Sequence, residues 1–263
     1  MLRYVSDLTE SSVTAADGDI GNVTAAFFDD QSWAIRYLVV DTGKWLPARE
    51  VLISPHSVSQ PLPNLSDDRN IQVRLTREQV KASPDIDTHQ PVSRQHEREF
   101  SAYYTYPEYW DGTDMWGIGG SPLMATYPPS PEQIAAANTL RGPSHARHLA
   151  AADRRLRSSV EVIGYDIQAT DESIGHVADF VFDDESWAIR YLIIDTYNWW
   201  PGGKKVLVAT QWIDSIDWAT SAVQVGLTRD GVKASPEYDE TVEIDRPYET
   251  RLHTAYNRKG YWD

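Results

Sequence analysis

An internal repeat constrains the fold of this chain more than any other feature of its sequence. Phe28 to Thr42 reads FDDQSWAIRYLVVDT, and Phe182 to Thr196 reads FDDESWAIRYLIIDT. Twelve of these fifteen positions are identical, and the offset between the two copies is 154 residues. A repeat of this length is the size of a domain, whereas solenoid repeats are shorter and more numerous. The sequence therefore predicts two related domains.

The similarity between the copies extends far beyond this segment. LTREQVKASP from Leu75 corresponds to LTRDGVKASP from Leu227, and both copies end on Tyr-Trp-Asp, at Tyr109 and Tyr261. We expect the aromatic tails to pack across the two domains. The stretch between the copies is rich in glycine and proline, and Ser130-Pro131 within it resembles a helix start. The predicted organisation is a first repeat with an aromatic tail at 1–111, a linker with a short helix at 112–157 and a second repeat with an aromatic tail at 158–263.

Alternating side chains predict strands within each repeat. From Trp33 to Val40 the alternation has a period of two, and one face is fully apolar. Residues 23–28 form a second predicted strand, joined to the first by a hairpin loop at 29–32. Thr76 and Gln79 have the spacing of a helix capping box. Further strands are predicted at 51–53, 71–75, 206–209 and 223–227. These short elements predict a mainly β fold of two tandem small barrels with short helical turns.

Composition narrows the classes of function. The formal net charge of −15 disfavours binding to nucleic acid and to anionic membrane surfaces. The absence of cysteine excludes disulfides and thiolate metal sites. No apolar stretch is long enough to span a membrane, and the first residues do not resemble a signal peptide. We therefore expect an acidic, soluble, cytoplasmic protein.

Three motifs of the first copy resemble the PRC-barrel family: Gly21-Asn22-Val23, Asp29-Asp30, and the run from Arg36 to Thr42. The second copy is closer still, from Ile174-Gly175-His176-Val177 to Asp195-Thr196 and then from Asn198 to Leu207. This family is named for the cytoplasmic domain of the photosynthetic reaction-centre H subunit. The chain looks like its tandem, soluble bacterial subgroup.

The resemblance implies a compact β-barrel that serves as an assembly or adaptor module. The leading hypothesis is thus a non-enzymatic protein-interaction module, with contact between the two barrels expected, a homodimer left open and the protein partner unidentified. A second hypothesis is a protein that binds small molecules or cations through loop carboxylates or a groove between the barrels. A third is an assembly factor for a photosynthetic or electron-transfer complex, by analogy with the H subunit.

Acidic hairpin loops are the most prominent candidates for chemistry. Asp29-Asp30 and Asp183-Asp184 could hold a cation, although aspartates of this kind also stabilise turns. The histidines do not occupy equivalent positions in the two copies, and neither a nucleophile elbow nor a glycine-rich phosphate loop occurs. The sequence therefore predicts no catalytic, cofactor or metal site.

Two further groups of residues are candidates for an interaction or ligand surface. Arg36 and Arg190 each stand in mid-strand between apolar residues, where they could bind a partner carboxylate or pair with an acid of their own repeat. Trp45, Trp199 and Trp200 lie in loops, where they could form an exposed patch or fill a contact between the barrels.

Overall fold

The computed structural model describes residues 1–47, 49–65, 68–84, 92–110, 115–117, 122, 156–199 and 201–263. The chain divides into two compact units. We call Asp7–Ser158 with Glu185–Trp187 the first-repeat unit. The second-repeat unit consists of Met1–Ser6, Ser159–Asp184 and Ala188–Asp263. The linker helix predicted after Ser130 lies outside the described residues.

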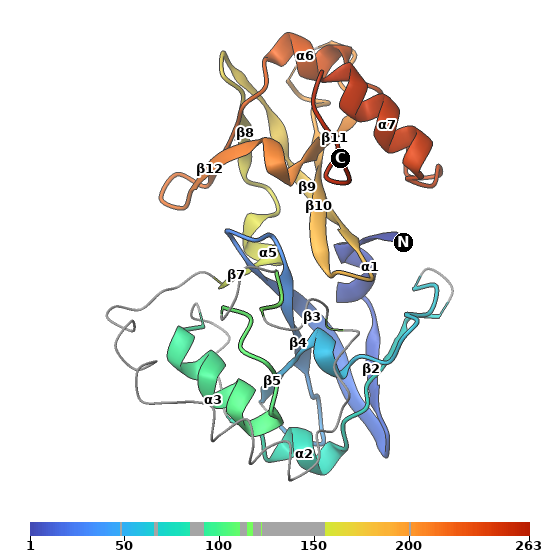
Figure 1. Ribbon diagram of the computed structural model, residues 1–263, viewed down its shortest axis with the longest axis vertical. Coiled ribbons are helices and arrows are strands. Elements are labelled where there is room, and N and C mark those ends of the chain that lie inside the picture. The colour runs from blue at the N-terminus through green and yellow to red at the C-terminus, as the bar shows by residue number, and fades with distance from the viewer. Residues whose placement is uncertain are drawn as a thin grey trace. The chain divides into compact units, whose positions relative to one another are not determined.

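The sheet of the first-repeat unit has the strand order β5-β4-β3-β2-β6, with β7 paired to β3 (Figure 1). All of its named pairs are antiparallel except β2 with β6. Its strands are β2 (Ser12–Ala15), β3 (Gly18–Asp29), β4 (Ile35–Asp41), β5 (Glu50–Ile53), β6 (Asn70–Gln72) and β7 (Leu156–Ser158).

The sheet of the second-repeat unit repeats this arrangement. Its order is β11-β10-β9-β8-β13-β12, and β1 pairs with β9. The pair β8 with β13 is parallel, like its counterpart in the first sheet. Its strands are β1 (Leu2–Tyr4), β8 (Asp166–Gln168), β9 (Ser173–Asp183), β10 (Ala188–Asp195), β11 (Lys205–Ala209), β12 (Ile213–Asp217) and β13 (Ala222–Val225).

The fold is mainly β, as predicted, but neither sheet closes into a barrel among the described residues. In the second-repeat unit the path of paired strands ends on β11 and β12, which follow one another along the chain. The 3₁₀ turn η4 (Thr210–Trp212) separates them, so the chain bends where a closing ladder would have to continue. In the first-repeat unit the 3₁₀ turn η1 (Pro55–Ser57) follows β5, and Val58 makes one isolated bridge with Val73.

The hairpin loop of the first repeat is longer than the alternation of side chains predicts. Asp29 Oδ1 accepts hydrogen bonds from the backbone amides of Gln31 and Ser32, at 3.1 and 2.8 Å. Trp33 then adopts a left-handed conformation, with φ 55°, before β4 begins at Ile35. Trp33 is nevertheless buried, as its place on the apolar face predicts, and it stacks on Phe28 with 5.3 Å between ring centroids.

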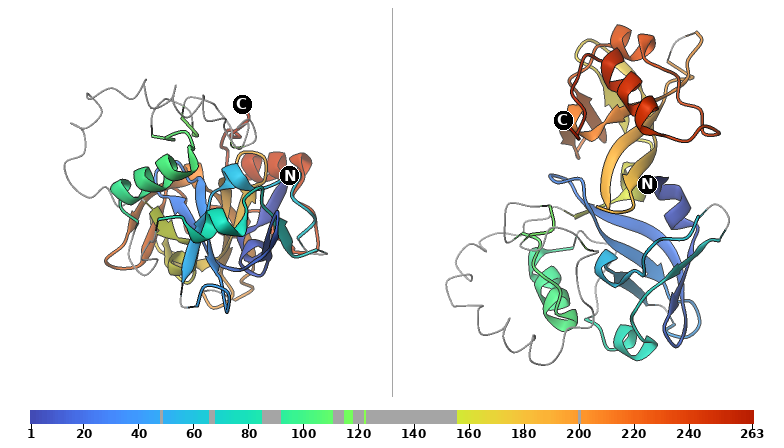
Figure 2. Two further views of the ribbon diagram at one scale, coloured as in Figure 1. Left: turned by 90° about the horizontal axis from the view of Figure 1, so that it is seen from below. Right: turned by 45° about the vertical axis from the view of Figure 1, so that its right-hand side comes forward.

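Both units also contain short helices, which are α1 (Val5–Thr9), α2 (Arg77–Lys81), α3 (Arg94–Tyr104), α5 (Ser159–Val162), α6 (Arg229–Ala234) and α7 (Arg246–Ala255). The predicted capping box is confirmed at α2, where Thr76 and Gln79 cap each other's backbone. Helix α3 lies beside the sheet of the first-repeat unit (Figure 2), and its Phe100 contacts Tyr37 edge-on at 5.1 Å between ring centroids. Helix α3 therefore covers the β4 face on which Tyr37 lies.

Candidate interaction site

The two aspartates in the hairpin loop of the first-repeat unit, Asp29 and Asp30, bind groups of that same unit. Asp29 is buried, and its Oδ1 atom also accepts a bond from the Ser32 hydroxyl at 3.0 Å. Asp30 forms an ion pair with Arg157 of β7, with 3.4 Å between Oδ2 and Nε. Both carboxylates thus stabilise the turn and its neighbouring strand.

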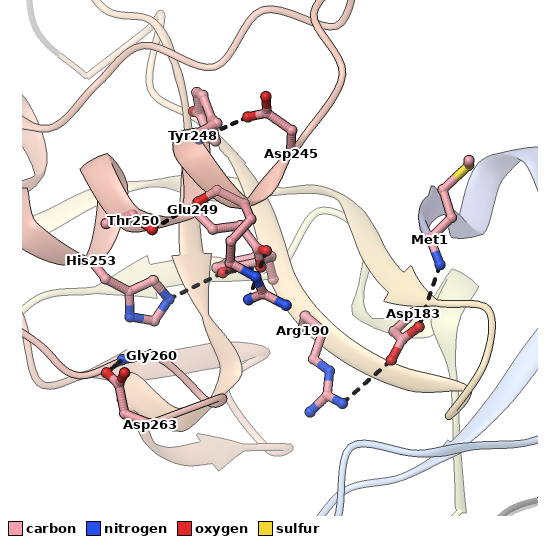
Figure 3. Close-up of polar contacts among 12 residues, drawn as sticks. Met1, Asp183, Arg190, Asp245, Tyr248, Glu249, Thr250, His253, Gly260 and Asp263 are labelled. Atoms are coloured by element: carbon pink, nitrogen blue, oxygen red, sulfur yellow. Dashed lines mark hydrogen bonds and ion pairs between the residues drawn. The ribbon is translucent and has the colours of Figure 1, made fainter.

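The equivalent carboxylates of the second-repeat unit, Asp183 and Asp184, contact residues of β1 and β10, and Figure 3 shows Asp183 between Met1 and Arg190. Asp184 accepts bonds from the Met1 amino group and from Arg3 Nε, each at 2.6 Å. Asp183 lies 3.7 Å from the Met1 amino group, and its Oδ2 atom lies 3.5 Å from Arg190 Nη2. The candidate cation ligands therefore already have cationic partners within the chain.

Arg36 lies in an aromatic enclosure rather than on an open surface. The side chain is 2% exposed, and its guanidinium lies 3.7 Å from the ring centre of Tyr109 and 4.6 Å from that of Trp116. Its Nη2 atom donates to the Ser32 hydroxyl at 2.9 Å. Desolvation lowers the pKa of Arg36, against the opposing effects of Tyr109 and Asp29. The aromatic faces thus stabilise a buried cation, together with the nearby carboxylates of Asp29 and Glu97.

The aromatic tails, for which packing across the domains was predicted, each contact arginines of their own unit. In the second-repeat unit Tyr261 lies against Arg190 at 4.1 Å, and Trp262 lies against Arg246 at 4.0 Å. In the first-repeat unit Trp110 lies against Arg94 at 4.5 Å. Arginines on a strand and a helix of the same unit hold each tail, because cation–π stacking suits their planar guanidinium groups.

A buried carboxylate lies behind the tail in the first-repeat unit. Glu97 of α3 is 1% exposed; its Oε1 atom accepts a bond from the Tyr109 hydroxyl at 2.5 Å and its Oε2 atom lies 3.0 Å from Arg94. Desolvation raises the pKa of Glu97 to about 7, although Arg94 and Tyr109 oppose the shift. The Tyr109 hydroxyl thus links the aromatic tail to α3.

The counterpart in the second-repeat unit adds a histidine (Figure 3). The Tyr191 hydroxyl lies 2.8 Å from Glu249 Oε1 and 3.0 Å from His253 Nε2. His253 Nδ1 lies 2.8 Å from the Lys259 carbonyl, which can only accept, so this nitrogen carries a proton. Desolvation lowers the pKa of His253 and raises that of Tyr191. The three side chains are 0 to 3% exposed, so this polar network belongs to the interior.

The candidate loop tryptophans Trp45 and Trp199 belong to different units, and each contacts residues of its own unit. Trp45 is half-buried; its indole nitrogen donates to the Ile20 carbonyl and its ring lies 4.5 Å from the Arg77 guanidinium. Trp199 is also half-buried, and its carbonyl accepts a bond from Arg229 at 3.4 Å. Trp200 lies outside the described residues.

An open pocket of about 510 Å³ occurs in the second-repeat unit. Tyr197 is 56% exposed at its rim, and Tyr238 is buried in its wall. Lys205 forms an ion pair with Glu240, and this contact raises the pKa of Lys205. The pocket lining comprises Tyr197, Lys205, Glu237, Tyr238, Asp239, Glu240 and Thr241. Three carboxylates against one ammonium give this lining a negative character.

The sequence predictions missed this pocket and the two buried networks. A signal for the networks exists, because Ser93 and Asp245 are helix N-caps, each followed four residues later by the buried glutamate of α3 or α7. A signal for the pocket is the difference between copies: Gly43 stands at the position of Tyr197, and Ile86 stands at that of Tyr238.

Comparison with known families identifies the second repeat. The family model described as the PRC-barrel domain matches residues 156–222, which run from β7 into β13. The second repeat therefore carries a PRC-barrel domain, which confirms the resemblance seen in its sequence. None of the curated proteins compared with the chain matches it.

The described residues lack two further features. They contain no group of three or more histidine, cysteine, aspartate or glutamate side chains placed to hold a metal ion. Within the same part of the chain, no helix has the length and apolar character needed to cross a membrane.

Proposed function

We propose that this protein is a non-enzymatic interaction module built from two PRC-barrel repeats. The PRC-barrel match of the second repeat supports an interaction module in general terms. The proposal includes the first repeat because twelve of the fifteen residues in the central segment are identical. The five strands that correspond between the two sheets also follow the same order. The polar groups that both repeats share contact one another inside each unit, which suits a scaffold role.

The pocket of the second-repeat unit is the proposed binding face for a protein partner. This pocket carries the proposal because it combines an exposed tyrosine, a hollow and a negative lining, and because its two tyrosines stand where the first repeat has Gly43 and Ile86. Tyrosine is enriched in protein interfaces because it offers a large apolar surface and a hydroxyl. Val242, which is 50% exposed, follows the pocket lining directly in sequence and would extend this face.

The partner proposed for this face is a protein that presents a basic side chain. Glu237, Asp239 and Glu240 outnumber the single ammonium of Lys205 in the lining. Hydrogen bonds from Thr241 lower the pKa of Asp239, which keeps this carboxylate charged. The net charge of −15 would also steer a basic partner towards the chain.

A pair of tyrosine substitutions tests this proposal. Tyr197→Ala removes the rim of the pocket, whereas Tyr103→Ala removes an exposed tyrosine of α3 in the other unit. Quantitative affinity capture with the full chain should lose a defined set of proteins with Tyr197→Ala and retain it with Tyr103→Ala. The capture should weaken as salt is raised, because the pocket is charged. Equal capture by both variants would overturn the proposed face.

Binding of a small cationic ligand is the second candidate, and the same negative lining favours it. A thermal-shift comparison of wild type and Glu237→Gln with calcium, magnesium and organic ammonium ions distinguishes the two. A shift that one cation produces and that Glu237→Gln abolishes would favour this candidate over a protein partner. The assembly-factor hypothesis rests only on the analogy with the H subunit.

A further inference from the structure

The two repeats begin with equivalent strands, and each of these strands belongs to the unit of the other repeat. Leu2 and Arg3 of β1 correspond to Leu156 and Arg157 of β7 at the repeat offset of 154. Strand β1 pairs with β9 in the second-repeat unit, whereas β7 pairs with β3 in the first-repeat unit. The PRC-barrel match begins at residue 156, so it includes β7 as the first strand of the second repeat.

The two pairings are equivalent in register. Tyr4 lies opposite Val181, and Ser158 lies opposite Phe27. Adding 154 to 4 and to 27 gives 158 and 181, so Tyr4 corresponds to Ser158 and Phe27 to Val181. Strand β1 therefore lies against β9 in the same register in which β7 lies against β3. The ion pairs follow the same rule, because Arg3 contacts Asp184 at 2.6 Å and Arg157 contacts Asp30 at 3.4 Å.

The length of the chain does not enforce this exchange. If β1 paired with β3, it would lie beside β2 along the same edge of β3. Residues 5–11 would then have to connect β1 to β2. Residues 22 to 27 of β3 span roughly 17 Å, whereas seven extended residues reach roughly 25 Å. The unexchanged arrangement is therefore within reach, and side chains must select the exchanged one.

Ser6 and Asp179 supply this selection. The Ser6 hydroxyl donates to Asp179 Oδ2 at 2.5 Å, and its amide lies 3.3 Å from Asp179 Oδ1. At the repeat offset, Ala25 replaces Asp179 and Val160 replaces Ser6. Pairing each strand within its own repeat would place Ser6 beside an alanine and the half-buried Asp179 beside a valine. The exchanged arrangement therefore gives Asp179 two hydrogen bonds from Ser6 in addition to the one from the Phe180 amide at 2.7 Å.

We infer that the β3 and β9 edges, with Asp30 and Asp184, are docking sites for the leading strand of another copy of the repeat. In this chain the other copy is supplied within the same molecule, and Ser6 with Asp179 assigns β1 to β9. The leading strand binds by β-strand addition to the edge of the sheet. The arginine of its Leu-Arg pair forms an ion pair with the second aspartate of the hairpin loop. This inference is independent of the partner proposed for the pocket.

Engineered disulfides test the exchange directly, because the chain has no cysteine of its own. The full chain would carry Tyr4→Cys with Val181→Cys, or Ser158→Cys with Val181→Cys as the matched control. Residues directly opposite one another on antiparallel strands have Cα separations that a disulfide can bridge. Mild oxidation, followed by mass spectrometry of peptides, should give an intrachain disulfide in the first variant and at least about tenfold less in the control.

Each other outcome overturns the inference. A disulfide in the control would mean that each repeat keeps its own strand. A Tyr4–Val181 disulfide that links two chains would mean that the strand comes from a second molecule. No disulfide in either variant would contradict the pairing itself. If Val181→Cys prevents folding, Ser158→Cys with Phe27→Cys should form the disulfide, and Tyr4→Cys with Phe27→Cys should not.

Discussion

At the scale of single residues, the polar groups shared by the two repeats contact one another inside each unit. Arg36, Asp29 and Glu97 are all buried in the first-repeat unit, and each has contacts within that unit. The sequence identified Arg36 and Asp29 because both copies retain them. It did not predict their neighbours, since Tyr109 and Glu97 lie far along the chain and only the folded tail brings them together.

The raised pKa of Glu97 makes stability depend on pH. Its folded pKa of about 7 lies above its ordinary value of 4.5, so the folded state binds this proton more tightly. The resulting stabilisation is complete below pH 4.5 and is lost as pH rises through 7. Between pH 5 and 7.5 we expect the free energy of unfolding of wild type to fall by on the order of 2 to 3 kcal/mol relative to that of Glu97→Gln.

Urea unfolding of both proteins across this pH range measures the effect. The amide that Glu97→Gln introduces cannot titrate, while its carbonyl oxygen can still accept the Tyr109 bond. Glu99→Gln, an exposed substitution on the same helix, is the control and should keep the pH profile of wild type. Parallel profiles for wild type and Glu97→Gln would contradict the argument.

The two strand arginines should differ in their tolerance of lysine. Arg36→Lys should lower the free energy of unfolding by about 1 to 2 kcal/mol, because an ammonium cannot stack between Tyr109 and Trp116 as a planar guanidinium does. Arg190→Lys should cost less, since its side chain is 21% exposed. Urea unfolding compares the two, and a larger loss for Arg190→Lys would refute this ranking.

At the scale of elements, local signals predicted the strand–loop–strand core and the capped helix α2. The sequence did not predict α3 and α7, although an N-cap and an i,i+3 Arg–Glu pair mark each of them. Their apolar stripes are short and interrupted by charges, so periodicity alone gives a weak signal. The start of β4 was predicted two residues early, because the hydrogen bonds of Asp29 extend the hairpin loop.

Gly21 marks a close approach between β3 and the end of β4. A Cβ atom at this position would lie 1.8 Å from the Asp41 carbonyl oxygen, and the backbone has φ +157°. Gly21→Ala should therefore destabilise the protein by about 3 kcal/mol or more, since backbone atoms must move. Gly43→Ala is the matched control; its Cβ meets nothing within 4 Å, so only the cost of φ +60° remains, about 1 kcal/mol. Thermal unfolding separates the two, and equal losses would contradict the account.

The ion pair between Arg3 and Asp184 should couple the first strand of the chain to β9. In a double-mutant cycle, Arg3→Ala and Asp184→Ala should show a coupling of about 1 kcal/mol, because both side chains are only 11% exposed. Arg3→Ala with Asp30→Ala should show no coupling. Urea unfolding provides the four free energies for each cycle, and coupling to Asp30 instead would argue for a strand that stays in its own repeat.

At the scale of the whole molecule, the repeat predicted two related units and a mainly β fold. Closure into barrels was not confirmed, because 3₁₀ turns interrupt the strands where the ladders would have to close. The membership of β1 and β7 could not be predicted, since both strands carry the same Leu-Arg pair and only the folded chain brings Ser6 to Asp179. The pocket was also missed, because its lining comes from two segments that only folding brings together.

The central claim is that the protein binds a partner through the pocket of the second-repeat unit. Site-specific photo-crosslinking in cells tests it most directly, with a photoreactive phenylalanine analogue replacing Tyr197 in one variant and Tyr103 in another. We expect a defined crosslinked protein from position 197 and not from position 103. An added Glu237→Lys substitution should remove this crosslink, because it reverses a charge in the pocket. The same crosslinks from both positions, or none from position 197, would contradict the account.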